Sequence, residues 1–386
     1  NQTLSISEPQ LKIVSCPLLF SWGGKTFAFL TDVISGGVVG ELVAPGKYWQ
    51  SDPDETLVIP SDKLKARLAQ ASDERNSEPQ HVYDLRFTNP LEETTLLDQA
   101  RLVAVDHPSG WEIYPNERLV ANPDYRPEDY VFALSNMQFP VTAIDHHGNN
   151  VLDALTRVDR RYFDNFSSTP WEGFAEEWNL TLEFATSDIF LPGSKAVIVL
   201  DGWTNWTSPQ GIIGADQAGV RPIGPFLEVL TEAGQWEMAN ANFGMPAGLP
   251  RTMVVDITDS IYNNLNSSNQ LMKMRIRSNL TIYFDRIRVG VESPGAQAQL
   301  NFRESLMLDA KLQWLGYPLP VMLEDKRPEI YQYKDPAQFS DLAIQHGDFT
   351  KYGDVKPLLK DVDDFFVIMN HGDEIALSFD AGSMPV

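Results

Sequence analysis

The hydrophobic and polar residues of this chain follow the pattern of short β-strands separated by turns. Residues 83–87 and 180–184 alternate between apolar and polar side chains, which is the period of a half-buried strand. Residues 196–200 (AVIVL) form a continuous apolar run, which predicts a strand buried on both faces. The chain is therefore expected to fold mainly as β-structure.

Turn signals between these runs predict hairpins. Residues 226–230 and 236–238 flank the sequence EAGQ, and Phe20 and Phe29 flank a Gly-Gly-Lys turn. Near the C-terminus, the residues NHGD at 370–373 separate two further apolar runs and predict a third hairpin. Residues 307–335 are rich in Pro and Tyr and predict an extended connection.

The density of strand signals predicts the architecture. Seven or eight strands in about 115 residues, from 178 to 291, are typical of a β-sandwich or jelly roll. We predict an all-β fold of tandem β-sandwich domains, the second jelly-roll-like, with few short helices. The expected divisions are an N-terminal β domain at 1–165, a jelly-roll-like sandwich at 166–295, and an extended connection with a C-terminal β-hairpin at 296–386.

Composition and charge narrow the classes of partner. The 386 residues are 43% hydrophobic and 22% charged, as in ordinary globular proteins. Acidic residues number 53 and basic residues 30, a net charge of −23, which repels a phosphate backbone and excludes nucleic acid as a partner.

Apolar neighbours predict a buried, inert thiol for Cys16, the single cysteine. No run reaches the roughly 20 apolar residues that span a bilayer, so no direct membrane span is expected.

The clearest candidate ligand site follows the apolar run at 196–200. The sequence there is Asp201-Gly202-Trp203-Thr204-Asn205-Trp206. If they lie in an exposed loop, Trp203 and Trp206 offer flat apolar faces to a sugar ring, with Asp201 beside them as a polar group. The alternative is that the tryptophans close the end of the sandwich core.

Two acidic loops are candidate calcium sites, because calcium prefers six to eight oxygen ligands. The candidate ligands are Asp52, Asp54 and Glu55 in one loop, and Asp361, Asp363 and Asp364 in the other. Neither loop has EF-hand spacing, and solvated or turn-capping carboxylates are the alternative. No other cofactor is expected.

Histidines and sequons provide further candidates. His146 and His147 lie in the sequence DHHGNN, which predicts a turn. On a strand, adjacent side chains point to opposite faces, so the two histidines are not expected to share a metal. Asn-X-Ser/Thr sequons begin at Asn1, Asn165, Asn179, Asn205, Asn266 and Asn279, and the last five are the candidate glycosylation sites.

Several segments resemble a β-rich region of large bacterial exported proteins. The first-half matches are 15–33 (including SCP and FSWGGK), PGKY at 45–48 with DPDE at 52–55, LEET at 91–94 and VDHP at 105–108 with YPNE at 114–117. The second-half matches are LDGW at 200–203, GMPAG at 244–248, RIRSNLTIYFD at 275–285 and YGDV at 352–355. The proteins it resembles carry FG-GAP/VCBS propeller repeats, ASPIC/UnbV domains or tetratricopeptide repeats.

This resemblance implies a non-catalytic, extracytoplasmic module attached to propeller or repeat domains, and it implies no catalytic residue. Those repeats are absent from the sequence, so the chain is expected either to be a fragment of a longer protein or to stand apart from the usual architecture, and the resemblance favours the fragment. We therefore expect a structural or interaction subunit of a periplasmic, cell-surface or secreted assembly, with protein partners or self-assembly.

Two alternatives belong to other classes. The first is a carbohydrate-binding module, stabilised by calcium, that uses Trp203 and Trp206. The second is a hydrolase that pairs Glu176 or Glu177 with Asp201.

Overall fold

The computed structural model is built from antiparallel strands with short helical segments between them, which confirms the predicted all-β fold class. The residues it describes are 12–33, 35–44, 47–50, 56–68, 80–115, 118, 131–185, 193–205, 209–240, 243–246, 248–260, 271–324, 326–363 and 365–382.

The chain forms two compact units. Unit 1 contains residues 1–55, 59–105 and 302–386, and unit 2 contains residues 56–58 and 106–301. This division differs from the three consecutive domains predicted at 1–165, 166–295 and 296–386. The difference arises because a strand near the C-terminus, β26 (Asp373–Asp380), pairs with a strand near the N-terminus, β7 (His81–Thr88).

Among the described residues, unit 2 contains ten strands and, with both bounds described, three short helical segments. They are β10 (Glu112–Pro115), β11 (Val131–Gln138), β12 (Thr142–Asp145), η1 (Leu152–Leu155), β13 (Phe174–Ala185), β14 (Lys195–Thr204), α1 (Pro209–Gln217), β15 (Phe226–Leu230), β16 (Trp236–Asn240), β17 (Arg251–Asp256), β18 (Leu271–Leu280), β19 (Ile282–Glu292) and η2 (Gln297–Gln299).

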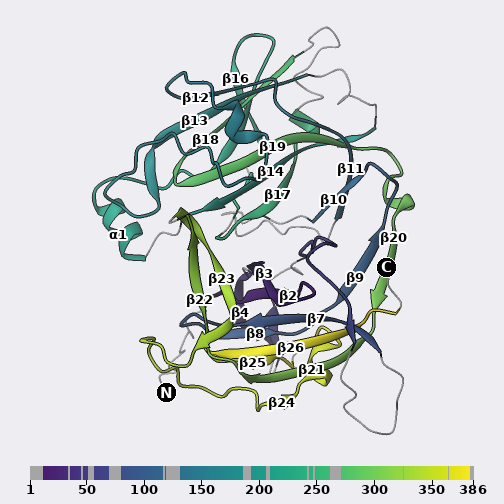
Figure 1. Ribbon diagram of the computed structural model, residues 1–386. Helices are drawn as coiled ribbons and strands as arrows, with labels where there is room; N and C mark the ends of the chain where they lie inside the picture. The colour runs from purple at the N-terminus through teal and green to yellow at the C-terminus, as the bar shows by residue number, and fades with distance from the viewer. Residues whose placement is uncertain are drawn as a thin grey trace, which may run out of the picture. The chain divides into compact units, whose positions relative to one another are not determined.

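These strands form a jelly-roll-like sandwich of two five-stranded sheets. One sheet has the order β10-β11-β19-β14-β17 and the other β12-β13-β18-β15-β16 (Figure 1). The main core lies between them, since alternate residues of β13 and β18, such as Leu182 and Met274, are buried with alternate residues of β14 and β19, such as Ile198 and Val289.

The predicted burial of residues 196–200 on both faces is confirmed. Ile198 and Leu200 belong to the main core, whereas Val197 and Val199 belong to a second cluster on the opposite face of the same sheet. Tyr114, Phe132, Leu134 and Val254 complete this second cluster. Residues 196–200 are apolar throughout because each face of the strand packs against a separate apolar cluster.

Unit 1 contains the remaining elements. They are β1 (Lys12–Ser15), β2 (Leu18–Trp22), β3 (Phe27–Asp32), β4 (Ser35–Ala44), β5 (Lys47–Gln50), β6 (Arg67–Leu68), β7, β8 (Thr95–Leu97), β9 (Leu102–Asp106), β20 (Asn301–Ser305), β21 (Met307–Trp314), β22 (Tyr317–Leu323), β23 (Lys326–Ala337), β24 (Gly353–Asp354), η3 (Lys356–Leu359), β25 (Val367–Met369) and β26.

The main sheet of unit 1 has the order β24-β21-β26-β7-β2-β3, with β6 also paired to β7. On one face, Leu85 of β7 lies opposite Leu377 of β26, and both are buried. On the other face, β7 and β26 place charged side chains such as Asp84 and Glu374, which are buried as well. In β7 and β26 this sheet therefore has one apolar face and one face with charged side chains, which we call the polar face, although Leu18 and Phe20 of β2 also lie on the latter.

Two of the three predicted hairpins form. Phe20 pairs with Phe29 between β2 and β3, and β15 pairs with β16 across the turn at 231–235. At the C-terminus, the chain turns at 370–373, where Asp373 N–H donates to the Asn370 carbonyl. The flanking strands diverge, however, because β25 pairs with β8 while β26 pairs with β7 and β21. A turn sequence specifies a chain reversal, but the partners of the strands are set by tertiary packing.

The region predicted as an extended connection is also strand. Residues 307–335 contain β21, β22 and most of β23, and the last two pair with each other. Tyr331 and Tyr333 of β23 pack on the aromatic side chains of β2 and β3. The tyrosines that suggested an irregular segment are thus part of a covering hairpin.

Candidate functional site

The predicted ligand residue Asp201 lies on β14 and is held by two neighbouring strands. One carboxylate oxygen accepts a hydrogen bond from Arg286 Nε of β19 at 2.7 Å, and the other accepts one from Thr252 Oγ1 of β17 at 2.5 Å. The residue is 7% exposed. Its side chain therefore links three strands of the sheet.

Trp203 is buried rather than exposed in a loop. It lies near the end of β14, is 6% exposed, and stacks on Tyr283, with Tyr162 packed edge-on against both rings. This geometry is that of an aromatic side chain that closes the core. Trp206, the second predicted stacking residue, lies outside the described residues.

The predicted calcium ligands are only partly described. Asp52, Asp54, Glu55 and Asp364 lie outside the described residues. Asp363 caps its own loop, because Oδ1 accepts a hydrogen bond from the Phe365 N–H at 2.8 Å. Among the described residues, neither Asp361 nor Asp363 belongs to a convergent cluster of metal-ligand atoms. The described geometry of Asp363 corresponds to the turn-capping alternative.

The sequon asparagines occupy different environments. Asn165 is exposed, Asn179 and Asn205 are half-buried, and Asn266 lies outside the described residues. Asn279 is 5% exposed, and its amide bridges the Arg221 carbonyl and the Ile223 N–H at 2.8 and 2.7 Å. The folded chain thus uses the Asn279 amide in packing and leaves no room there for a glycan.

A convergent cluster that the sequence did not predict lies in unit 2. Nε2 of His146 and Nε2 of His147 lie 3.3 and 3.5 Å from the same oxygen, Oε1 of Glu176. The two imidazole rings are tilted by 37°, with centroids 3.9 Å apart. We refer to these three residues as the His-His-Glu cluster.

The two histidines converge because they lie in a turn. β12 ends at Asp145, and the chain reverses with a hydrogen bond from Gly148 N–H to the Asp145 carbonyl, where Gly148 has φ +85°. The predicted turn is confirmed. The opposite-face argument applies only to strands, and in this turn the Nε2 atoms of both histidines lie near the same carboxylate oxygen.

Asp145 holds this turn in place. Its carboxylate accepts four hydrogen bonds, from the backbone of His147, the backbone and side chain of Asn149, and the side chain of Asn165. Burial opposes ionisation of Asp145, but these bonds outweigh it and lower the pKa. The backbone that carries both histidines is therefore fixed by a buried carboxylate.

Glu176 is positioned by an irregularity in β13. The register between β13 and β18 shifts between Phe174 and Trp178, and Glu176 lies within this shift. Such bulges redirect a side chain that a regular strand would place elsewhere. Oε1 of Glu176 also accepts a hydrogen bond from the Ser167 N–H at 2.7 Å, which, with His146, lowers the pKa of Glu176 to about 2.

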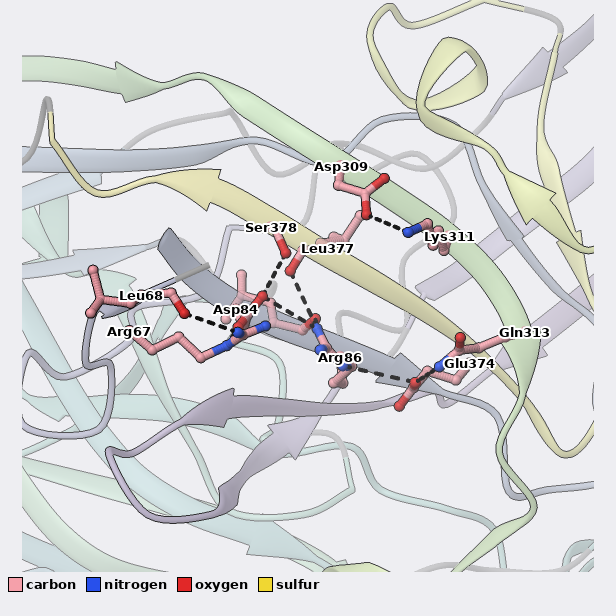
Figure 2. A network of polar contacts seen from close by, with 11 residues as sticks. Arg67, Leu68, Asp84, Arg86, Asp309, Lys311, Gln313, Glu374, Leu377 and Ser378 are labelled. Carbon is pink, nitrogen blue, oxygen red and sulfur yellow. Dashed lines mark hydrogen bonds and ion pairs between the residues drawn. The ribbon is translucent and has the colours of Figure 1, made fainter. Parts of the chain in front are cut away.

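Unit 1 contains a buried network of charges on the polar face of its main sheet (Figure 2). Asp84 accepts hydrogen bonds from Arg67 and Ser378, and Arg86 lies 3.8 Å from both Asp84 and Glu374. Gln313 of β21 donates to Glu374 at 2.8 Å. Burial raises the pKa of Glu374 above its ordinary value, although nearby Tyr333 and Arg86 oppose the shift.

Two aromatic side chains pack at this network. The guanidinium of Arg86 lies 4.4 Å from the centroid of the Phe27 ring, and Phe27 packs on Tyr333 of the covering β23. Each charge in the network has a neighbour of opposite charge or a hydrogen-bond partner. These contacts connect β6, β7, β21 and β26.

A long segment of unit 1 is fixed to the fold yet exposes apolar side chains. In residues 338–363 and 365–366, the part at 350–355 is anchored by hydrogen bonds from Thr350 N–H to the Ile368 carbonyl, from Val355 N–H to the Ala310 carbonyl, and from the Tyr352 hydroxyl to Asp373. The exposed large apolar side chains in it are Phe339 (93%), Ile344 (77%), Phe365 (67%), Val362 (57%) and Tyr352 (52%). We call residues 338–366 the apolar segment.

Comparisons of the chain with protein-family models, with curated proteins and with solved structures found no match. The resemblance to exported propeller and repeat proteins thus rests on the sequence motifs alone and stays a prediction. Among the described residues, no helix is long and apolar enough to cross a membrane.

Proposed function

We propose that the protein is a non-catalytic structural or interaction subunit that associates with other protein chains through the apolar segment of unit 1. The observation that carries the proposal is the exposure of Phe339, Ile344 and Phe365 in a segment anchored by backbone hydrogen bonds. Large exposed apolar side chains are typical of protein interfaces.

The charge of the apolar segment favours one kind of partner. Within the apolar segment, the described acidic residues Asp341, Asp348, Asp354, Asp361 and Asp363 outnumber the lysines Lys351, Lys356 and Lys360. Together with the net charge of −23, this favours a partner whose contact surface is apolar with a basic rim. Such complementarity disfavours a second acidic copy of the same surface.

We also propose that the assembly is extracytoplasmic. The support is the sequence resemblance to exported proteins and the set of sequons, of which Asn165 is exposed. Calcium at the two acidic loops and carbohydrate binding near Trp206 stay predictions. The interaction proposal requires neither of them.

The proposal is tested by association of the chain purified gently from its native source. Sedimentation and native mass spectrometry compare the parent with the triple variant Phe339→Ser, Ile344→Ser and Phe365→Ser. We expect a stoichiometric complex for the parent and its loss in the variant, at an unchanged unfolding temperature. The matched control replaces three similarly exposed residues of unit 2, Val158, Ile213 and Met238, by Ser. A strictly monomeric parent, or equal loss in the control, overturns the proposal.

A further inference from the structure

We propose that His146, His147 and Glu176 bind one divalent transition-metal ion of the zinc class. All three residues offer ligand atoms that lie within 4.8 Å of one another. Two imidazoles and one carboxylate, completed by water, form a ligand set that zinc adopts in proteins. The inference is independent of the proposed protein association, because the cluster belongs to unit 2 and the apolar segment belongs to unit 1.

The distances are also those expected between two ligands of one ion. The separations from Glu176 Oε1 to the two Nε2 atoms are 3.3 and 3.5 Å, at the long end of hydrogen-bond distances. Two ligands bound at about 2.0–2.1 Å to a tetrahedral ion lie about 3.3–3.4 Å apart. The distance from the carboxylate oxygen to each imidazole nitrogen is thus already close to the distance between two ligand atoms of one tetrahedral ion.

The protein has largely organised this site in advance. Asp145 fixes the turn that carries both histidines, and the bulge in β13 together with the Ser167 N–H fixes the carboxylate of Glu176. Hydrogen bonds of this kind orient metal ligands and reduce the conformational entropy lost on binding.

One adjustment is required. The imidazole centroids are 3.9 Å apart, whereas two imidazoles on one tetrahedral ion lie about 5 Å apart. The side chain of His147 is 46% exposed, so it can swing outward, while His146, at 11%, stays packed. The same exposure leaves the fourth ligand position accessible to water.

The donor atoms select the class of metal. Calcium and magnesium require mostly oxygen ligands, which two imidazoles do not supply. Imidazole nitrogen suits Zn²⁺, Cu²⁺, Ni²⁺ and Co²⁺, and the single carboxylate is compatible with each. The protein's net charge of −23 favours the approach of any cation, so selectivity must come from the histidines.

The test is calorimetric titration of the whole chain, purified without a histidine tag and stripped with a chelator, using Zn²⁺ alone as the probe. We expect one saturable site per chain and a rise in unfolding temperature on addition of Zn²⁺. Co²⁺ should bind at the same stoichiometry, with the strong visible absorption of a four-coordinate ion. Ca²⁺ should not compete.

Variants assign the binding to the cluster. His147→Ala and Glu176→Gln should each weaken Zn²⁺ binding at least tenfold, and the double variant should abolish it. The amide of Gln can still accept the Ser167 hydrogen bond, so Glu176→Gln should fold, as its unfolding temperature without metal will show. The matched control is His107→Ala, an exposed histidine outside the cluster, which should bind as the parent does. Absence of a one-to-one site, or unchanged affinity in both cluster variants, overturns the proposal.

Discussion

Trp203 of β14 lies directly opposite Tyr283 of β19, and the two rings stack with centroids 4.4 Å apart and planes within 10° of parallel. Cross-strand aromatic pairs of this kind stabilise a sheet beyond the apolar area that they bury. The stacking face of Trp203 is thus occupied by another residue of the same chain. A role for Trp203 in stability therefore explains its position.

The first prediction concerns this pair. Trp203→Ala should lower the free energy of unfolding by about 3–5 kcal/mol, the usual cost of removing a large buried aromatic side chain. Denaturant unfolding measures the loss, and Trp203→Phe should lose less because it keeps a ring against Tyr283. A Trp203→Ala protein of parental stability that has lost affinity for a glycan would instead support the carbohydrate-binding alternative.

The second prediction concerns Gly202, where the register between β14 and β19 shifts. A Cβ added there collides with the Tyr283 carbonyl oxygen and lies 3.1 Å from the Phe284 ring. Because the carbonyl belongs to a paired strand, Gly202→Ala should cost about 1–3 kcal/mol of stability. Gly224→Ala is the matched control, since an added Cβ there has no neighbour within 4 Å. Equal stability of the two variants would contradict the prediction.

The third prediction separates structure from glycosylation at Asn279. Asn279→Ala removes the bridge between the Arg221 carbonyl and the Ile223 N–H, and should cost about 1–3 kcal/mol. Thr281→Val destroys the same sequon, but the Thr281 hydroxyl is buried without a hydrogen-bond partner, so this change should leave stability unchanged or higher. Thermal unfolding compares the two. If both variants lost similar stability, and if neither loss occurred in protein made without glycosylation, the result would show that a glycan at Asn279 stabilises the fold.

The fourth prediction is a pH dependence that arises from Glu374. Its pKa is raised in the folded state, chiefly by burial, so the folded protein holds this proton more tightly than the unfolded chain does. The resulting stability is complete below the unfolded value of 4.5 and is lost as the pH rises through the raised folded pKa. A tenfold difference in proton affinity between the folded and unfolded states corresponds to about 1.4 kcal/mol.

Glu374→Gln removes this titration. The unfolding free energy of the parent minus that of Glu374→Gln should therefore fall as the pH rises from acid to neutral. Denaturant unfolding at a series of pH values measures the difference. A difference that is constant, or that grows with pH, would contradict the prediction.

The strands that could be predicted were those whose own sequence determines their burial. Residues 196–200 are apolar without interruption because both faces of β14 contact apolar clusters, and β15 and β16 follow each other across a short turn. In these cases the pattern and the turn carry all the necessary information. The burial of Asp84 on β7 could not be predicted from the local sequence, because its contacts include Ser378, 294 residues away in the sequence.

The candidate sites show the same limit. Trp203 could be named from the sequence, but its burial depends on Tyr283 and Tyr162, which no local pattern places beside it. The His-His-Glu cluster was missed because a two-residue period was applied to a turn, and because Glu176 points toward the histidines from a bulge. The Gly at 148 was the available signal, since a residue with positive φ often follows a turn of this type.

The division of the chain between the two units has a consequence for its synthesis. Unit 2 is almost entirely one continuous stretch, residues 106–301, so it can fold as soon as that stretch has left the ribosome. The main sheet of unit 1 cannot close at that stage, because β7 still lacks β26. Until β26 has been synthesised, β7 has no partner strand along the edge that β26 later occupies. The nascent chain therefore passes through a stage with one folded unit and one sheet edge that still lacks its partner strand.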